Sequence, residues 1–286
     1  MKELDEEKRL VEEAISGNPA ALESVLESVR DGVFNLSLRM LGMLPDAEDA
    51  TQEILIKVMT HLSSFRQESR LTTWVYRIAV NHLQDYRKGM FAQHPLSFET
   101  YGEDIASGRE KDVPDLSGGV DQALLEEELK LSCTNVMLQC LDADSRCIYI
   151  LGTMFRLDSR MAADILGITP EAYRQRLSRV RKKMANFLSA YCGLSDTGVC
   201  SCKHRTNYAI ATHRIDPNHM NFTTLSPCTY ADLLDCRDAM EELDNQSQIF
   251  AGLPAYRSTE HLTSWIRRVM DSESFFAIVN GKESSK

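Results

Sequence analysis

Residues 158–183 read DSRMAADILGITPEAYRQRLSRVRKK, and this segment holds two helical blocks separated by a turn with a glycine. Asp158 and Thr169 are residue types that cap helix N-termini, and Pro170 suits the first position of a helix. A short helix, a three-residue turn beginning at Gly167 and a capped basic helix together predict a helix-turn-helix. The second helix of this motif enters the major groove of DNA.

The second helical block carries the side chains expected to contact DNA. Leu177, Val180 and Met184 share its inner face, and basic residues occupy its outer face. Arginine reads guanine with two hydrogen bonds and glutamine pairs with adenine, so the N-terminal end predicts base contacts. A solvated basic face without a partner is the alternative. The DNA-binding residues predicted for this motif are Arg160, Thr169, Glu171, Arg174, Gln175, Arg176 and Arg179, and those that suit phosphate are Arg179, Arg181, Lys182 and Lys183.

A second segment interleaves basic side chains with aromatics and amides. Residues 65–88 read FRQESRLTTWVYRIAVNHLQDYRK. Aromatic rings stack on unpaired bases, amides read base edges, and Arg or Lys holds the backbone, so this mixture predicts contact with single-stranded nucleic acid. A place in the core of an amphipathic helix is the alternative for Trp74 and Tyr76.

The charge distribution narrows the class of protein. The chain has 286 residues, a net charge of −10 and 43% hydrophobic residues, which is ordinary for a soluble globular protein of two or three domains. Residues 65–90 carry five Lys/Arg against two Asp/Glu, and residues 158–189 carry seven against three. Two basic islands in an acidic chain predict weak DNA binding by the chain alone and stronger binding within a complex.

Neither a membrane span nor a signal peptide is expected. The sequence has no run of eighteen apolar residues, and its N-terminus is acidic and lacks an apolar stretch. The expected compartment is therefore the cytoplasm. In that compartment the eight cysteines are expected to be reduced, bound to metal or buried as small hydrophobic side chains.

Helical periodicity runs through most of the chain and is interrupted at residues 89–120 and again in the short, polar stretch 190–225. Leu22, Val25, Leu26 and Val29 mark one amphipathic helix, whereas glycines, prolines and acidic residues cluster between residues 89 and 120. The sequence predicts an all-α protein with two helical DNA-binding modules and a small, mainly helical C-terminal extension. The predicted parts are a first module at 1–90, a flexible linker at 91–120, a second module at 121–189 and the extension at 190–286.

Both modules resemble parts of one known family. Residues 46–53, DAEDATQE, together with residues 65–81, resemble region 2 of the extracytoplasmic-function (ECF) group of the bacterial sigma-70 family. Residues 124–188 look like region 4 of the same group, and the resemblance covers roughly residues 10–190. Two departures occur in region 4: the family usually shows Leu-Pro before the arginine that is Arg146 here, and Tyr173 stands where a small aliphatic residue is common.

The resemblance implies a sigma factor, which binds core RNA polymerase, directs it to promoters and helps to melt the minus-ten element. Region 2 would dock on the clamp helices of polymerase, and the helix-turn-helix would read the minus-thirty-five element as duplex. Polymerase would do the chemistry, so neither enzymatic activity nor a required cofactor is expected, and an anti-sigma or signalling protein is a further expected partner. The residues implied for polymerase binding are Asp46, Asp49, Gln52, Glu53 and Ile56, and those for the minus-ten element are Arg66, Arg70, Thr73, Trp74, Arg77, Asn81, His82, Arg87 and Lys88.

The cysteines form two groups. Cys133, Cys140 and Cys147 recur every seven residues in helical sequence, which predicts core packing. After region 4, three cysteines and a histidine could complete a tetrahedral zinc site, with redox-active thiols or plain structural cysteines as alternatives. The predicted zinc ligands are Cys192, Cys200, Cys202 and His204.

Two rival interpretations remain for the whole chain. One is a helix-turn-helix regulator that binds DNA without being a polymerase subunit, which leaves residues 46–88 unexplained. The other is a zinc- or thiol-dependent enzyme with a DNA-binding appendage, although the sequence shows no HExxH, GxSxG or glycine-rich phosphate loop. The position and the apolar stripes of residues 205–286 suggest that the extension packs on the sigma modules or binds a regulator.

Overall fold

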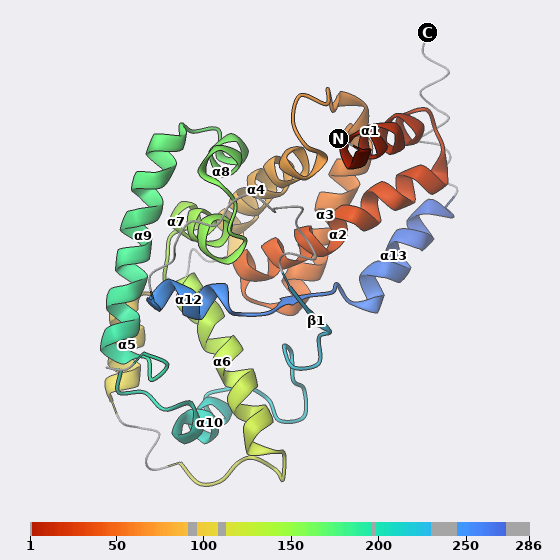
Figure 1. Cartoon of the computed structure of the whole chain (residues 1–286). Coiled ribbons are helices and arrows are strands. Elements are labelled where there is room, and N and C mark those ends of the chain that lie inside the picture. The colour runs from red at the N-terminus through yellow and green to blue at the C-terminus, as the bar shows by residue number, and fades with distance from the viewer. Residues whose placement is uncertain (1, 91–95, 108–112, 196–197, 230–244, 273–286) are drawn as a thin grey trace.

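In a computed structural model of the chain, the described residues are 2–90, 96–107, 113–195, 198–229 and 245–272 (Figure 1). Within these ranges nearly all regular structure is helical, which confirms the predicted all-α fold. The α-helices are α1 (Lys2–Ile15), α2 (Pro19–Leu41), α3 (Leu44–His61), α4 (Leu71–Met90), α5 (Phe98–Ala106), α6 (Gln122–Gln139), α7 (Ala143–Tyr149), α8 (Ser159–Leu166), α9 (Pro170–Tyr191), α10 (Cys202–Ala211), α12 (Asn245–Ala251) and α13 (Glu260–Met270). The shorter elements are η1 (Leu62–Ser64), a π-helical turn η3 (Ile150–Met154), and the strands β1 (Pro227–Cys228) and β2 (Ala255–Tyr256), which pair antiparallel.

Helix α2 is the central element of the molecule. Asn18 caps its N-terminus by accepting hydrogen bonds from the backbone N–H groups of Ala20 and Ala21, and Gly42 ends it in the left-handed conformation. Every residue from Asp31 to Leu41 is buried, so the second half of the helix has neighbours on all sides. Along its whole length α2 contacts α1, α3, α4, α6, α7, α13 and β2.

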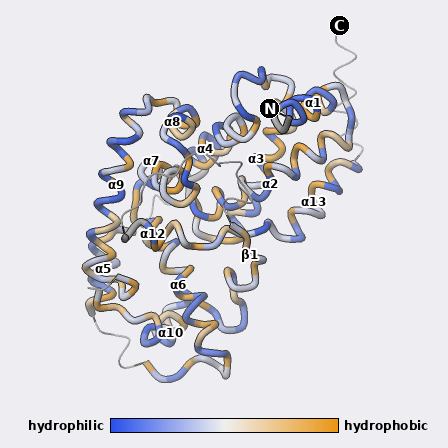
Figure 2. Tube along the Cα trace, viewed as in Figure 1, coloured by the Kyte–Doolittle hydropathy of each residue, from blue (hydrophilic) through white to orange (hydrophobic). Residues whose placement is uncertain are grey.

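The helix-turn-helix forms as its sequence predicts. Asp158 caps α8 by accepting hydrogen bonds from two backbone N–H groups, and Gly167 ends the helix with φ 64°. Thr169 then caps α9 by accepting from the N–H of Ala172 at 3.2 Å. Figure 2 shows that the part of α9 nearer α8 is hydrophilic, in keeping with an exposed recognition helix.

The predicted flexible linker at 91–120 contains a docked helix, so the prediction of a flexible linker is wrong for residues 98–106. Helix α5 starts with a reciprocal hydrogen-bonded cap between Ser97 and Thr100, and it packs against α9 through Phe98 and Tyr101, whose ring centroids lie 4.9 and 5.6 Å from that of Phe187. A side chain at Gly102 would meet the Tyr191 ring, so the glycine permits close packing rather than flexibility. The remaining parts of the linker that fall on 91–95 and 108–112 lie outside the described residues.

The extension packs on both modules instead of forming a separate body. Helix α12 lies against α9 and η3, while α13 runs beside α2 (Figure 1). One continuous hydrophobic core includes residues from Val11 to Met270. Of the apolar stripe expected at Leu262, Trp265, Ile266, Val269 and Met270, the structure buries Leu262, Ile266 and Met270 and half-buries the other two. The other expected stripe, at Leu233, Cys236, Met240 and Leu243, lies outside the described part of the chain. None of the helices described here has the length and apolar character needed to cross a membrane.

Candidate nucleic-acid interface

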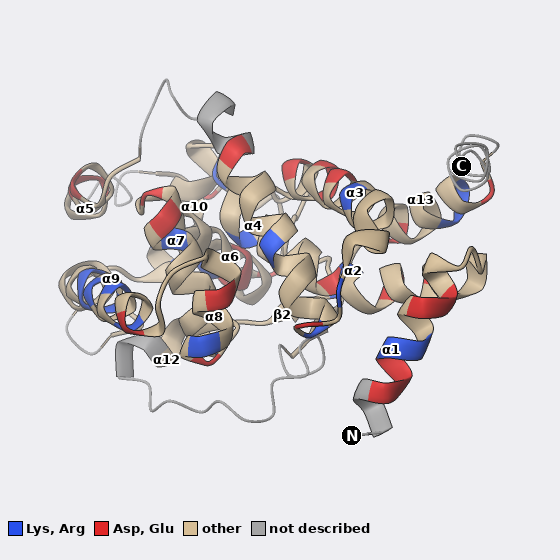
Figure 3. Cartoon of the chain, turned by 90° about the horizontal axis from the view of Figure 1, so that it is seen from above, with Lys and Arg blue, Asp and Glu red and all other residues tan. Residues whose placement is uncertain are grey.

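The exposed face of α9 and the start of α8 form a basic surface. All seven residues predicted to bind DNA here are exposed: Arg160, Thr169, Glu171, Arg174, Gln175, Arg176 and Arg179. Glu171 organises its neighbours, since its carboxylate accepts from Arg174 at 2.7 Å and from Gln175 at 3.1 Å. These hydrogen bonds lower the pKa of Glu171. Figure 3 shows the lysines and arginines gathered along α9, so this surface can meet the phosphates and base edges of a major groove.

Two residues of α9 face inward and have structural roles. Arg181, which suited a phosphate contact by sequence, instead lies half-buried and donates to Gly152 O at 3.0 Å and Thr153 Oγ1 at 3.1 Å. Tyr173 is buried and donates from its hydroxyl to Ile148 O at 3.2 Å. This contact with α7 explains why a large polar aromatic can replace a small aliphatic residue there.

The structure divides the predicted minus-ten residues into an exposed and a buried set. Arg66, Arg77 and Asn81 are exposed, and Arg70 and Trp74 are half-buried, with the Trp74 ring tilted against Phe65 at a centroid distance of 5.3 Å. Thr73 and His82 are buried, so a direct base contact is not available to either in this structure. Arg87 and Lys88 belong to α4, but their side chains lie outside the described part.

His82 links α4 to α3. Lys57 Nζ lies 2.7 Å from its Nδ1, and Glu53 Oε2 lies 3.4 Å from its Nε2. Burial and the positive charge of Lys57 lower the pKa of His82, although the charges of Glu53 and Asp85 act in the opposite direction. Because the Lys57 ammonium donates to Nδ1, the neutral form of the His82 ring is favoured. Through its contacts with Lys57 and Glu53, the His82 side chain holds α4 against α3.

An acidic, partly apolar surface lies along α3. Asp49, Glu53 and Ile56 are exposed, and Asp46 and Gln52 are half-buried beside them. Burial and the nearby Asp49 carboxylate raise the pKa of Asp46, which shows that negative charge is crowded at the start of the helix. A cationic partner would relieve this repulsion, so the surface is suited to a basic protein face with a small apolar contact.

Helix α4 packs against the first helix of the helix-turn-helix and against α7. Arg77 Nη2 of α4 lies 2.7 Å from Asp164 Oδ1 of α8, and Gln84 of α4 donates to Asp144 of α7 at 3.1 Å. Behind these polar contacts, the Tyr76 and Phe155 rings lie 5.9 Å apart. In this arrangement the basic residue Arg77 is held by the helix-turn-helix itself.

Arg146 joins the two modules, a role that the sequence does not predict. Arg146 is fully buried and donates to the backbone carbonyls of Leu138, Met40, Gln139 and Leu141 and to the side chain of Gln139. It therefore joins α7 to the end of α6 and to α2, across the boundary of the two modules. The residues before Arg146 lack the Leu-Pro that is usual in the family. Here Asp142 caps the start of α7 instead, accepting from Ser145 N at 2.8 Å.

Burial raises the pKa of several cysteine thiols, two of them in the core. Burial raises the pKa of Cys140 to about 11 and that of Cys147 to about 12, in keeping with their predicted core packing. Burial likewise raises the pKa of Cys200 to about 12 and of Cys202 to about 11, so these thiols stay protonated near neutral pH, which disfavours redox reactivity.

Zinc binding at Cys192, Cys200, Cys202 and His204 stays a prediction that this geometry does not support. Among the residues that can be placed, no three His, Cys, Asp or Glu side chains are arranged to hold a metal ion. The imidazole of His204 is exposed, whereas the three cysteines are half-buried.

The sequence of the chain is similar to that of known sigma factors. Residues 25–89 match the family model for sigma-70 region 2. The chain is 26% identical over 179 residues to the ECF RNA polymerase sigma factor SigW of Bacillus subtilis, a match that covers 62% of this chain and 94% of SigW. It is 27% identical over 190 residues to the RNA polymerase sigma factor CnrH of Cupriavidus metallidurans, covering 65% of this chain and 96% of CnrH.

A solved structure of CnrH in complex with the cytosolic domain of CnrY is also similar, with a TM-score of 0.45 and 22% identity, and it covers 64% of this chain and 96% of that one. The sequence matches include nearly the whole of SigW and CnrH and leave the rest of this chain without a counterpart. Residues 25–89 match a sigma-70 region 2, and most of the chain is similar in sequence to sigma factors of the ECF group.

Proposed function

We propose that the chain is a sigma factor that docks on core RNA polymerase, directs it to two-element promoters and helps to melt the minus-ten element. The acidic surface of α3 would bind polymerase, the exposed residues of α4 and the preceding loop would contact the minus-ten element, and α9 would read the minus-thirty-five element. The proposal assigns no catalytic step to this chain. Such a factor would act in the cytoplasm, the compartment expected from the sequence.

The observation that carries this proposal is the pairing of two different surfaces on α3 and α4 within a sigma-70 region 2. An acidic face with exposed Ile56 lies on α3, and arginines with an aromatic pair lie on and before α4. A regulator that binds duplex DNA alone needs only the helix-turn-helix. The additional surfaces support a protein that works as a subunit of polymerase.

Polymerase binding tests the proposal directly. Asp49 and Glu53 are exposed on α3, so Asp49→Lys and Glu53→Lys reverse charges on the proposed docking face. We expect each variant to bind core polymerase more weakly than the unmodified protein, by at least about tenfold, which corresponds to the loss of one close charge pair at an interface. Binding can be measured by titrating labelled protein with core enzyme.

Glu27→Lys is the matched control because Glu27 is also exposed but lies on α2, away from this face. It should bind polymerase as the unmodified protein does. Equal binding by all four proteins would show that α3 is not the docking surface. The proposed function would be contradicted if neither the unmodified protein nor the variant Arg257→Ala/Ser258→Ala bound core polymerase.

A further inference from the structure

Three polar residues on one face of α2 bind the backbone of the C-terminal extension. Asn35 and Arg39 lie four and eight positions after Asp31, and all three side chains are buried. Asn35 Nδ2 donates to Tyr256 O at 2.7 Å, while Tyr256 N donates to Asn35 Oδ1 at 2.9 Å. The side-chain amide of Asn35 thus pairs with both backbone groups of Tyr256, as a residue of a neighbouring β-strand would. We call residues 254–259, the bound segment, the strap.

The two ends of this face hold the strap by charged groups. Arg39 donates to Pro254 O at 2.8 Å. Asp31 accepts from Ser258 N at 3.0 Å, from Ser258 Oγ at 2.6 Å and from Arg257 Nη1 at 3.0 Å. Burial acts to raise the pKa of Asp31, but the hydrogen bonds from Ser258 and Arg257 and the charge of Arg30 outweigh it and lower the pKa. The carboxylate is therefore stabilised in its charged form by the strap.

The extension also holds the second module. Before the strap, α12 packs on η3 and α9, with Phe250 edge-on against Tyr149 at 5.4 Å. After the strap, Thr259 donates to Glu48 of α3 and Arg267 of α13 lies 3.7 Å from Glu23 of α2. Residues 245–270 therefore span both modules, as the course of α12 and α13 in Figure 1 shows.

This closed arrangement does not fit a promoter. By their names the two elements lie about 25 base pairs apart, which is about 85 Å along B-form DNA. Here α4 contacts α8, the helix that immediately precedes the recognition helix, through the Arg77–Asp164 ion pair. The two modules must separate before both elements can be bound at once.

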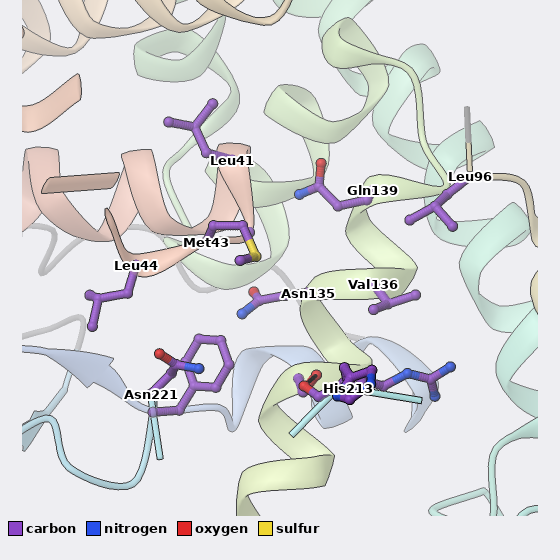
Figure 4. Close-up of a pocket in the computed structure, with 13 residues that line it drawn as sticks. Leu41, Met43, Leu44, Leu96, Asn135, Val136, Gln139, His213 and Asn221 are labelled. Atoms are coloured by element: carbon purple, nitrogen blue, oxygen red, sulfur yellow. Dashed lines mark hydrogen bonds between the residues drawn. The ribbon is translucent and has the colours of Figure 1, made fainter. Parts of the chain in front are cut away.

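The seam between the modules is imperfectly packed, which favours separation. A pocket of about 280 Å³ lies between the α2–α3 turn, α6 and residues 213–222. Figure 4 shows Asn135 directed toward Met43 and Leu44 across this pocket. Asn135 Oδ1 accepts from Arg39, but its buried Nδ2 has no hydrogen-bond partner among the described residues. Because well-packed interiors leave few such voids, this part of the junction contributes less packing than the continuous core around it, and the polar contacts of the strap add to what holds the modules together.

We propose that the Asp31–Asn35–Arg39 face of α2 is an intramolecular docking site for the strap, and that the docked strap keeps the two DNA-binding modules closed. Promoter binding then requires release of the strap from α2. This inference rests on the proposed function and adds the regulation of the same surfaces.

The double variant Arg257→Ala/Ser258→Ala tests this role. Both side chains lie at the surface end of the contact, so the fold is expected to survive their loss. Removing the two side-chain bonds to Asp31, while the N–H of residue 258 keeps its own, should raise the open population by about tenfold, the factor typical of a hydrogen bond to a charged group. Hydrogen exchange of residues 254–259 should accelerate, and promoter-specific transcription with limiting core polymerase should rise several-fold.

Ser264→Ala/Arg268→Ala is the matched control, because it removes the same two residue types from the exposed side of α13. It should keep the exchange rate and the transcript yield of the unmodified protein. Unchanged exchange in Arg257→Ala/Ser258→Ala, or faster exchange with an unchanged transcript yield, would overturn the inference alone. Failure of all three proteins to give promoter-specific transcripts would instead contradict the proposed function, and the inference would fail with it.

Discussion

Arg146 shows how one buried side chain can hold the two modules together. It is fully buried and its guanidinium donates to four backbone carbonyls from three segments. Arg146→Ala would remove all of these buried hydrogen bonds at once and leave a cavity in their place, so we expect the free energy of unfolding to fall by about 3 kcal/mol or more. Urea denaturation followed by circular dichroism measures this change.

Arg160→Ala is the matched comparison, since Arg160 is exposed at the start of α8. Its stability should stay within about 0.5 kcal/mol of the unmodified protein, as for most surface substitutions. An equal loss of stability in both variants would contradict the assigned role of Arg146. The two arginines look alike in sequence, and only their surroundings separate them.

His82 gives a prediction at the same scale for pH dependence. Burial and Lys57 lower its pKa below the ordinary value of 6.5, so the unfolded chain takes up this proton at a higher pH than the folded one. The free energy of unfolding should therefore decrease as the pH falls through 6.5 toward the folded pKa, by at most about 1.4 kcal/mol per pH unit for one group. Urea denaturation at pH 7 and pH 5 measures it.

His82→Gln should show a smaller loss of stability between these two pH values. His61→Gln is the control, because His61 is exposed on α3, and it should keep the slope of the unmodified protein. If His82→Gln kept the full pH dependence, the neutral buried imidazole between Lys57 and Glu53 would be the wrong description of this site.

At the scale of elements, the two ends of α9 are expected to do different work: the N-terminal part contacts base edges of the promoter, and the later part contacts phosphates. Arg176 lies near the start of the helix and Lys182 lies further along, and both are exposed. In the polymerase complex, Arg176→Ala should cost about 1–3 kcal/mol of promoter binding and relax the preference at one base pair. Lys182→Ala should weaken binding to all sequences alike and reduce the slope of log K against log salt by about 1.

Titration of labelled promoters with the reconstituted complex at several salt concentrations measures both effects. Ser178→Ala, an exposed change on the same helix, should leave the affinity and the salt slope unaltered. Loss of base preference in Lys182→Ala rather than in Arg176→Ala would reverse the assignment of the two ends of α9.

Elements were predictable where their signals are local. Asp158, Gly167 and Thr169 cap α8 and α9 through hydrogen bonds or backbone angles that involve only nearby residues, and the structure confirms them. Helix α5 was missed because its stability depends on Phe187 and Tyr191, some ninety residues away in the chain. Likewise, nothing in the sequence near Asn35 indicates its partner Tyr256, which lies 221 positions further on.

For the candidate site, sequence patterns located the surfaces better than the individual side chains. The basic outer face of α9 and the acidic face of α3 are exposed as expected from helical periodicity. Helical periodicity predicts the same exposure for Arg181 as for the arginines around it, but the Arg181 side chain turns inward and donates to Gly152 O. The resemblance also implies DNA contact for Thr73 and His82, but both side chains are buried, and His82 faces Lys57 of α3.

At the scale of the whole molecule, the relatives and the structure together define what is particular to this chain. SigW and CnrH are matched over nearly their full length, and the match leaves more than a third of this chain outside it. In the structure the segment after α9 packs against both modules, so this additional part contributes to the same hydrophobic core. The chain thus combines a sigma architecture with an extension that holds it closed.

The central claim is that this chain directs core RNA polymerase to promoters, and transcript mapping tests it most directly. Core polymerase would be combined with a promoter library and with the unmodified protein, Glu53→Lys or Arg257→Ala/Ser258→Ala, and the 5′ ends of the transcripts would be sequenced. We predict transcripts that share a two-element promoter upstream of their start sites, lost with Glu53→Lys and increased with the double variant. Absence of such transcripts, together with tight duplex DNA binding by the protein without polymerase, would contradict the claim and identify a helix-turn-helix regulator instead.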